Sequence, residues 1–424
     1  MKIFADTHLH GRFSRATSKE LTIPNLEKYA RLKGINLLGT GDIQHPGWYA
    51  ECKKYLPKEK EGIYYTESGF PFILSTELSL IYTQGGKGRR VHIHLLLPSF
   101  EIVDKLVAYL LKNGRIDYDG RPIFKISCEQ LTLDLKAMSD DIEVIPAHIW
   151  TPWFSMFGSK SGFDKIEDCF GSATKHIYAL ETGLSSDPPM NWRLSALDKY
   201  TLVSNSDLHS FWPWRIGREA TIFDCNLLYG NILKALRTKE GYVGTIEVDP
   251  NYGKYHFDGH RNCNVCLHPK ESLKNNNICP KCKRPLTVGV LQRVEELADR
   301  PEGFVPEGAG KFFKLLPLSE IISTVLNKGI MTKEVWKNYY EILKAGKDEM
   351  DILLNVDGDK LLGVTNPQMV DAILKNRLGK IEVKPGYDGE YGIPVLGNKK
   401  IHENTDSKPA DIPPNKQKGL GEFF

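Results

Sequence analysis

Short apolar runs alternate with amphipathic segments over the first 250 residues of the chain. The apolar runs are rich in β-branched residues, as in INLLGTGD, FPFILSTELS and EVIPAHIW, and such runs predict buried strands. Between most of them lie stretches with apolar residues at helical spacing, namely residues 23–34, 100–114 and 128–140. The alternation predicts parallel β/α units, and seven such units favour a barrel over an open sheet.

The pattern changes after about residue 250. Four cysteines fall within residues 251–290, helical periodicity returns over 291–384, and residues 385–424 are rich in Gly, Pro, Asn and Lys. We therefore expect an α/β barrel over 1–250, followed by a small ribbon, a helical domain and a flexible tail.

Composition is that of an ordinary soluble protein. Hydrophobic residues make up 41% and charged residues 26% of the 424 positions. The sequence has no run of the ~18 apolar residues that a membrane span needs, so we expect a cytoplasmic protein without a membrane partner. The net charge of +3 does not indicate nucleic acid by itself, but residues 254–285 hold seven basic and two acidic residues. That stretch is suited to contact with phosphates.

Polar residues able to bind metals follow the ends of several predicted strands. In an extended strand, residues two apart share a face, so Asp6, His8 and His10 could meet one ion. The C-terminal ends of barrel strands converge on one rim, where carboxylates and imidazoles suit Zn²⁺, Mn²⁺ or Fe²⁺. The candidates at these strand ends are His8, His10, His45, Glu77, His94, His148, Asp207 and His209.

The motifs DTHLH, TGD with a nearby histidine, STELS, HIH, PAHIW and SDLHS resemble, in this order, those of the PHP (polymerase and histidinol phosphatase) family over residues 1–225. The resemblance implies a distorted seven-stranded β/α barrel, a trinuclear metal site and phosphoester hydrolysis. The implied ligands are His8, His10, Glu77 and Asp207 for one ion, Glu77, His94 and His148 for a second, and His45 and His209 for a third, with the first four also forming the expected catalytic set.

Some assignments stay open at this stage. His92 shares a strand face with His94, and we favour His94 because the LLL that follows it is where family members continue after their ligand. The segment TGDIQH leaves open whether Asp42, His45 or both bind metal. The segment GRFSRATS lacks a histidine that many family members have, so the third ion could be weaker or absent. Glu181 suits either ligation or an outer role.

Two CxxC pairs separated by twelve residues predict a structural Zn²⁺ site in the ribbon. The spacing allows four thiolates to surround one ion tetrahedrally. The predicted ligands are Cys263, Cys266, Cys279 and Cys282.

Aromatic residues directly follow several of the candidate metal ligands. Most are expected to pack against the barrel rim, but three aromatic loops at one mouth also offer stacking surfaces for an extruded base, with cations nearby for phosphates. The candidates for contact with DNA are Trp150, Trp153, Phe154, Lys160, Trp212 and Arg215.

The chain ends in QKGLGEFF. Gln417, Leu420 and Phe423 are spaced by three, so a single 3₁₀ turn would align them, with Phe424 adjacent. The segment resembles the Q-x-x-L-x-x-F-F peptide by which replication and repair proteins bind the sliding clamp PCNA, which implies PCNA as a partner.

Barrel, ribbon, helical region and clamp peptide, in this order, resemble the archaeal endonuclease Q family. The resemblance implies a monomeric DNA repair enzyme that hydrolyses the phosphodiester bond 5′ to deaminated bases (uracil, hypoxanthine, xanthine) and abasic sites, with Zn²⁺ in ribbon and barrel and Mg²⁺ or Mn²⁺ for activity. Two alternatives remain: a PHP phosphatase acting on a small phosphomonoester, and a non-catalytic DNA-binding adaptor tethered to the clamp.

Overall fold

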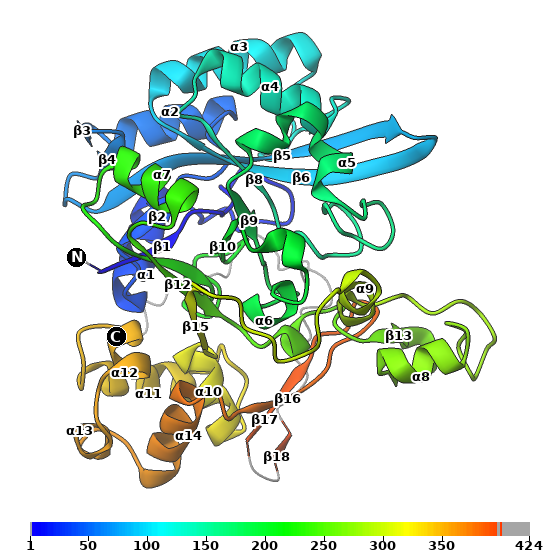
Figure 1. Ribbon diagram of the computed structural model, residues 1–424. Helices are drawn as coiled ribbons and strands as arrows, with labels where there is room; N and C mark the ends of the chain where they lie inside the picture. Colours follow the sequence, from blue (N-terminus) through cyan, green and yellow to red (C-terminus); the bar gives the residue numbers. More distant parts are fainter. Residues whose placement is uncertain (1, 397–398, 401–424) are drawn as a thin grey trace.

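A mixed β-sheet runs through the first 250 residues of the chain (Figure 1). The computed structural model describes residues 2–396 and 399–400. Strands β1 (Lys2–Asp6), β2 (Leu37–Gly39) and β5 (Pro71–Gln84) are parallel neighbours. On the other side of β1, strands β11 (Ala220–Asp224) and β12 (Tyr242–Glu247) continue the sheet in antiparallel order.

The strict alternation of strands and helices is interrupted at β5 and β6 (Lys87–Leu97), which form a long antiparallel hairpin. Gly85 and Gly86, with φ of 60° and 73°, make a turn too tight to leave room for a helix. β6 then pairs antiparallel with β8 (Glu143–Pro146), and β7 (Ile123–Phe124) pairs parallel with β5. The expectation of uniformly parallel β/α units is therefore wrong for this part.

Two further strands, β9 (Ala179–Glu181) and β10 (Thr201–Val203), form a parallel pair. β9 lies against β8 and β10 against β12, so these strands follow one another around the molecule. Within the described ranges, no ladder of hydrogen bonds joins β8 to β9 or β10 to β12. The α/β class is as predicted, while the closed barrel stays a prediction.

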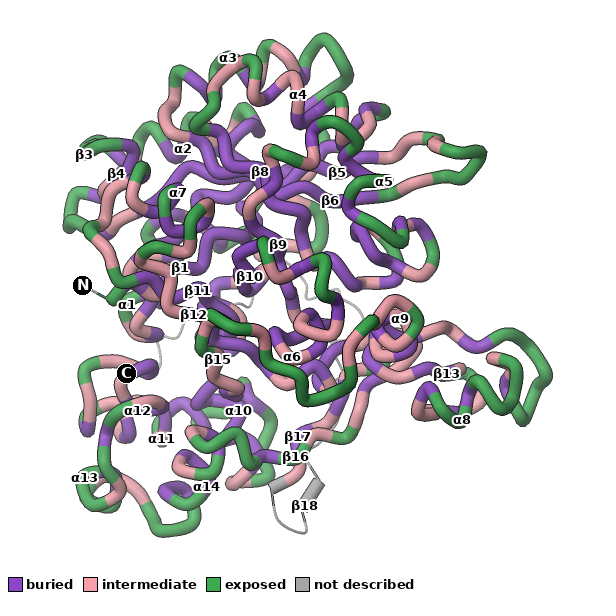
Figure 2. Tube along the Cα trace, in the orientation of Figure 1, coloured by how far each residue is buried: buried purple, intermediate pink, exposed green. Residues whose placement is uncertain are grey.

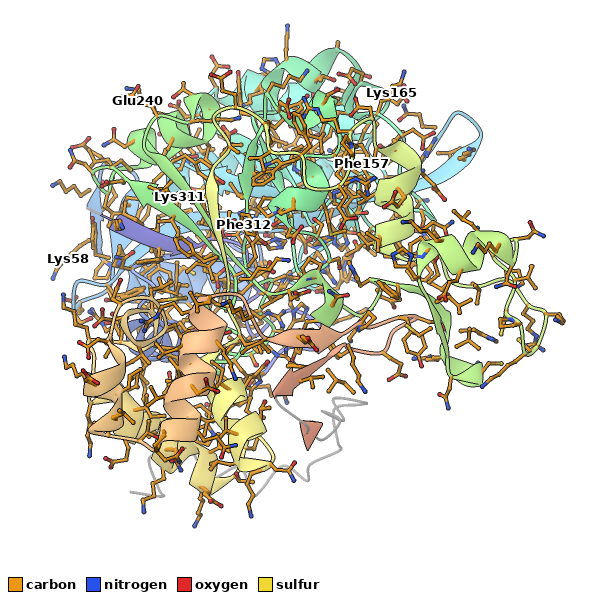
Figure 3. All side chains as sticks on the ribbon, turned by 60° about the horizontal axis from the view of Figure 1, so that its bottom comes forward. Lys58, Phe157, Lys165, Glu240, Lys311 and Phe312 are labelled. Atoms are coloured by element: carbon orange, nitrogen blue, oxygen red, sulfur yellow. The ribbon has the colours of Figure 1, made fainter. Side chains whose placement is uncertain are left out.

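Helices cover the outside of these strands, and the predicted helical segments are confirmed as α1 (Ile23–Lys33), α3 (Phe100–Asn113) and α4 (Cys128–Met138). Each begins at a hydroxyl residue whose side chain accepts a backbone N–H of the first turn. Buried residues line the central strands beneath them (Figure 2). In Figure 3 the charged Lys58 and Glu240 lie at the periphery, whereas Phe157 is buried. The remaining elements of this region are β3 (Lys58–Lys60), β4 (Ile63–Tyr65), α2 (Pro46–Tyr55), α5 (Ile166–Phe170), α6 (Pro188–Asn191) and α7 (Tyr229–Thr238).

A small arm projects from the body after β12 (Figure 1). It contains β13 (Asp258–His260), β14 (Val265–Leu267) and α8 (Pro269–Lys274), and we call residues 256–288 the ribbon arm. Helix α9 (Val290–Leu297) ties it to the body, because Arg293 donates hydrogen bonds to backbone carbonyls of the 150–163 loop.

The C-terminal part packs five helices together, with β15 (Lys311–Lys314) extending the main sheet parallel to β12. A buried ion pair between Lys33 and Glu349 (2.5 Å) joins this part to α1. The helices are α10 (Leu318–Leu326), α11 (Lys333–Leu343), α12 (Glu349–Leu354), α13 (Gly358–Leu362) and α14 (Pro367–Arg377).

Part of the segment predicted as a flexible tail instead forms strands: β17 (Ile393–Leu396) pairs antiparallel with β16 (Glu382–Lys384) and with β18 (Lys399–Lys400). Gly386 bonds through its backbone to both Asn251 and Phe257 at the base of the ribbon arm, which holds this segment in place. The predicted clamp peptide (Gln417, Leu420, Phe423, Phe424) lies outside the described residues. Among those described, no helix is long and apolar enough to cross a bilayer.

Candidate metal centre

The DTHLH segment leaves the end of β1 and turns two buried imidazoles inward. Asp6 does not join them. Its carboxylate accepts the backbone N–H groups of Ser206 (3.0 Å) and Gly217 (2.9 Å), so it holds the loop that carries Asp207. Burial raises the pKa of Asp6 to about 6. The prediction that Asp6, His8 and His10 share one ion is therefore wrong for Asp6. Its carboxylate is occupied by the two backbone N–H groups.

Four side chains from three distant segments form the first ligand group. Ligand atoms of His8, His10, Glu77 and Asp207 all lie within 4.8 Å of one another. The Nε2 atom of His10 is 3.1 Å from Asp207 Oδ1 and 3.3 Å from Glu77 Oε2. His8 Nε2, His10 Nε2 and Asp207 Oδ1 are buried without a hydrogen-bond partner. Since orphaned buried polar atoms are costly, this group fits a bound cation.

A second group shares Glu77 and consists of Glu77, His92 and His148. Glu77 Oε1 is 2.8 Å from His92 Nδ1 and 3.1 Å from His148 Nε2. The predicted ligand His94 instead packs beneath the first group, with its ring stacked on His8 at 4.7 Å and its Nε2 3.3 Å from Thr7 Oγ1. Spacing could not separate these two histidines, because residues 92 and 94 share one face of β6. We call the two groups together the rim cluster.

Outer carboxylates orient the two first histidines. His8 Nδ1 lies 2.9 Å from Glu181, which also accepts the backbone N–H of His148. His10 Nδ1 lies 3.0 Å from Asp42, which also accepts the backbone N–H of Gly11. Such pairs fix the ring so that Nε2 faces a metal. Asp42, predicted as a ligand, thus supports His10 from the side away from the ligand group, and Glu181 supports His8 in the same way.

The third predicted ion has no ligand group among the residues that the structure describes. His45 caps α2, where its Nδ1 accepts the N–H of Gly47 (3.2 Å), and its ring stacks on Phe13. His209 lies beside His10, with ring centres 4.6 Å apart. The structure does not bring these two histidines together, because His45 serves the helix terminus.

Backbone strain gathers at this site. Asp42, His148, Phe154 and Asp207 all have positive φ, between 29° and 60°. Left-handed backbone is costly for residues other than glycine, and it persists where the surroundings impose it, often at functional sites. Two of these residues, His148 and Asp207, belong to the ligand groups, and the other two contact them: Asp42 lies beside His10 and Phe154 beside His92.

Charges at the rim cluster favour anionic carboxylates and an accepting imidazole. Burial by itself raises the pKa of Glu77, but the nearby His92, Arg121 and His8 outweigh burial and hold this pKa well below its usual range. Burial lowers the pKa of His92 to about 4, so this imidazole is neutral near pH 7. A neutral imidazole keeps a lone pair for a cation.

Arg121 is a neighbour that the sequence analysis missed. Its Nη1 donates to Glu77 Oε2 at 3.0 Å from the loop before β7. No motif surrounds it in RIDYDGRPIF, so its only signal is spatial.

The predicted DNA contacts divide into buried and open residues. Trp150 is 1% exposed and donates to Asn191, and Trp212 stacks on Trp214 and packs against Trp336 of the helical part. Trp150 and Trp212 therefore fix the loops that carry them, because large apolar rings gain most from packing. Trp153 is open, being 36% exposed.

Among the described residues, Phe154 is the only one of the other three predicted contacts that touches the rim cluster. Phe154 is half-buried with its ring 4.7 Å from His92. Lys160 lines a polar cavity of about 580 Å³ together with Arg89 and Arg293. Arg215 is half-buried, and its backbone N–H bonds to Trp212.

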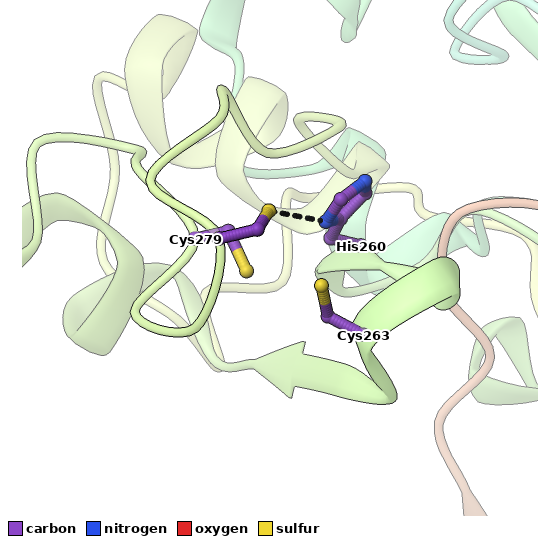
Figure 4. A group of neighbouring side chains, drawn as sticks. His260, Cys263 and Cys279 are labelled. Atoms are coloured by element: carbon purple, nitrogen blue, oxygen red, sulfur yellow. Dashed lines mark hydrogen bonds between the residues drawn. The ribbon is translucent and has the colours of Figure 1, made fainter.

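A second, separate set of ligands lies in the ribbon arm (Figure 4). It consists of His260, Cys263, Cys279 and Cys282, which we call the ribbon cluster. His260 Nδ1 is 3.1 Å from Cys282 Sγ. The predicted Cys266 is not part of it. Cys266 lies in β14 opposite Gly259, beyond the turn at Asn264, and its sulfur is 4.0 Å from Pro385 O.

Comparison with known sequences relates most of the chain to two proteins. A family model described as the MJ0043 C-terminal domain matches residues 317–380. Protein MJ0043 of Methanocaldococcus jannaschii is 33% identical over 297 residues, 68% of this chain and 35% of that protein, so the chain spans about a third of its length. Protein YqxK of Bacillus subtilis is 30% identical over 414 residues, 92% of this chain and 98% of that one.

Two solved structures superpose on nearly the entire chain. The lesion-specific endonuclease EndoQ of Pyrococcus furiosus matches with a TM-score of 0.84 and 30% identity, covering 93% of this chain and 96% of that one. Endonuclease Q in complex with a 27-mer duplex that has an abasic lesion at the active site matches with a TM-score of 0.84 and 31% identity, covering 94% and 97%. This chain therefore belongs to the endonuclease Q family.

Proposed function

We propose that this chain is a metal-dependent DNA repair endonuclease that hydrolyses the phosphodiester bond 5′ to deaminated bases and abasic sites. The observation that carries the proposal is the sharing of buried Glu77 by two ligand groups. Two ions held by one carboxylate form a common arrangement for phosphodiester cleavage. Membership of the endonuclease Q family supports the same reaction.

The donor set suits Zn²⁺ or Mn²⁺, because imidazole nitrogen and carboxylate oxygen are their usual ligands. His8, His10, Glu77 and Asp207 would hold one ion, and Glu77, His92 and His148 a second. When bound, such ions acidify water and neutralise charge on the phosphate. Three protein ligands in the second group are the number found in catalytic zinc sites. Hydrolysis at this rim needs no nucleophilic serine or cysteine.

Lesion recognition is proposed for the open side of the 150–163 loop. Phe154, beside His92, and the exposed neighbouring Trp153 offer rings on which an extruded base can stack. Deamination replaces an exocyclic amine by a carbonyl, so a pocket of hydrogen-bond donors accepts the lesion and leaves the normal base unpaired. The cavity beside the loop has donors in Arg89 and Lys160, whereas Arg293 already donates to Phe157 O, Phe163 O and Asp164.

A nicking assay tests this function. Four end-labelled duplexes carry a uracil, a hypoxanthine, an abasic site or no lesion at one position. We expect cleavage 5′ to each lesion, with 3′-hydroxyl and 5′-phosphate ends, and at least ten times less cleavage of the intact duplex. Chelator-treated protein should not cut until a divalent metal is returned. Equal cutting of all four duplexes, or turnover of phosphomonoesters without DNA cleavage, would contradict the proposal.

The ribbon cluster is proposed as a structural zinc site whose basic surroundings contact DNA. Three thiolates and one imidazole match the closed coordination of structural zinc.

The terminal peptide is proposed as the site of PCNA binding. Deletion of residues 417–424 should leave nicking by the isolated enzyme unchanged and abolish capture by immobilised PCNA. Unchanged capture of the truncated chain would contradict this assignment.

A further inference from the structure

Arg121 is fixed beside Glu77 by the sheet itself. The residue precedes β7, and Pro122 O accepts the backbone N–H of Ser79, two positions beyond Glu77 on β5 (3.1 Å). The pairing places the guanidinium against the shared carboxylate, with Nη1 3.0 Å from Oε2. A side chain held by a strand pair is positioned more rigidly than one on a free loop.

The loop before Arg121 is built into the same wall. Gly120 accepts a hydrogen bond from Gln44 Nε2 (2.5 Å), and its N–H donates to Phe13 O (3.3 Å). A Cβ at position 120 would lie 2.2 Å from Ser14 Oγ and 2.3 Å from Asp42 Oδ2, so only glycine fits. The loop thus covers Asp42, on the side where the sequence predicted a third ion.

The guanidinium reaches from the buried cluster to the open mouth. The Arg121 side chain is 31% exposed, whereas Glu77 is fully buried. Within residues 2–396, Glu77 is its only side-chain ion-pair partner, which leaves further N–H groups of the fork available. Arginine presents five donors in a planar fork that matches phosphate oxygens.

Formal charges support an anion at this position. Four carboxylates face the rim cluster and would balance two divalent ions, which leaves the positive charge of the guanidinium to the anionic reactants. That charge is equal and opposite to the charge of one phosphodiester. The carboxylates are Asp42, Glu77, Glu181 and Asp207.

We propose that Arg121 is a catalytic residue that binds a non-bridging oxygen of the scissile phosphate, supplying the positive charge where the third ion was predicted. This inference rests on the endonuclease function proposed above. Arg121 stabilises negative charge as the phosphate is attacked, while Glu77 remains with the metal ions.

Single-turnover nicking of an abasic duplex by three variants tests the role. Arg121→Ala should cut about 10²–10³-fold more slowly, with the metal content and melting temperature of the wild type. Arg121→Lys should recover part of the rate, because it keeps the charge without the fork. Arg115→Ala is the matched control, since Arg115 lies in the same loop, is 74% exposed and pairs only locally with Asp117.

Two readouts separate phosphate binding from mere support of Glu77. Millimolar guanidinium ion should restore part of the nicking rate of Arg121→Ala. It should leave the rate of the control Arg115→Ala unchanged. One phosphorothioate diastereomer at the scissile phosphate should slow the wild type more than the other, and this difference should disappear in Arg121→Ala. Binding of inorganic phosphate, followed by calorimetry, should weaken about tenfold in Arg121→Ala only.

A near-wild-type nicking rate in Arg121→Ala would overturn the proposal. Loss of the rim metals from Arg121→Ala, without rescue by guanidinium ion, would also overturn it, because Arg121 would then only position Glu77. Both differ from failure of the proposed function, in which the wild type itself does not cut lesion DNA. Gly120→Ala gives a second check. Its clash with Asp42 should displace the loop and lower the rate although the guanidinium is present.

Discussion

The rim cluster and the ribbon cluster are both candidate metal sites, but they differ in their ligands and in how they are assembled. The rim cluster draws imidazoles and carboxylates from residues 8 to 207, and its members are buried or nearly so. The ribbon cluster draws three thiols and one imidazole from residues 260 to 282, in a small arm with a core of only a few apolar side chains. Assembly of the first depends on the whole fold, whereas the second can be assembled locally.

This difference predicts what each metal does. The strands that carry the rim cluster are held by a large apolar core, so they should stay folded without metal. The ribbon arm buries Val265, Cys279 and Leu286 as its own core, which is too little to order it alone. Metal at the rim therefore serves the reaction, and metal in the ribbon serves the fold.

The largest expected effect follows from removing the shared ligand. Glu77→Gln should lower the nicking rate by at least about 10³-fold, because both ligand groups lose their common oxygen. Elemental analysis should find the rim metals lost and one zinc retained. Glu67→Gln, at a site 80% exposed, is the control. Full metal content in Glu77→Gln would break the comparison.

Next in size is the loss of a ribbon ligand. Cys263→Ser should remove one zinc and expose residues 256–288 to protease, because structural zinc contributes about 10–16 kcal/mol in small zinc domains. Rim metals should remain. Cys266→Ser should keep the zinc, since its sulfur lies against Pro385 and not in the ribbon cluster. Zinc loss in Cys266→Ser, with zinc retained in His260→Ala, would restore the four-cysteine prediction.

A smaller effect is expected where the two regions meet. Trp153 touches Tyr255 at the base of the ribbon arm, with ring centres 5.6 Å apart. Trp153→Ala should weaken binding of an abasic duplex by about 1–3 kcal/mol through lost stacking, as measured by fluorescence anisotropy, without loss of metal from either cluster. Phe304→Ala, at another exposed ring, should bind like the wild type. Equal weakening of duplex binding by Trp153→Ala and Phe304→Ala would contradict a specific role of Trp153 in stacking.

The last prediction concerns the folding stability of the first 250 residues and leaves both metal clusters unchanged. Burial raises the pKa of Glu219 to about 8, so the folded protein keeps a proton that the unfolded chain loses near pH 4.5. Its contribution is fully present below pH 4.5 and is lost as pH rises toward 8, by up to about 1.4 kcal/mol per pH unit. Urea unfolding from pH 5 to 8 should show a flatter dependence for Glu219→Gln than for the exposed control Glu240→Gln. Equal slopes would contradict it.

Much of the rim cluster was predictable because strand geometry is local. Alternation along a strand and the position of strand ends were enough to select His8, His10 and Glu77, which the structure brings together. The choice between His92 and His94 was not predictable, since both face the same side of β6 and only the contacts of His94 with His8 and Thr7 separate them.

Other features depend on contacts that spacing does not encode. His45 was drawn into a helix cap, and Arg121 reaches a carboxylate 44 positions away through a strand pair. In the ribbon, the CxxC pattern suggested Cys266, but the turn at Asn264 sends its thiol elsewhere and admits His260.

Anomalous scattering from crystals of the metal-loaded protein tests the central claim most directly. We expect two peaks about 3.5–4 Å apart, one between His8, His10, Glu77 and Asp207 and one between Glu77, His92 and His148, with a separate peak in the ribbon cluster. Peaks at His45 or His94, or none around Glu77, would contradict it.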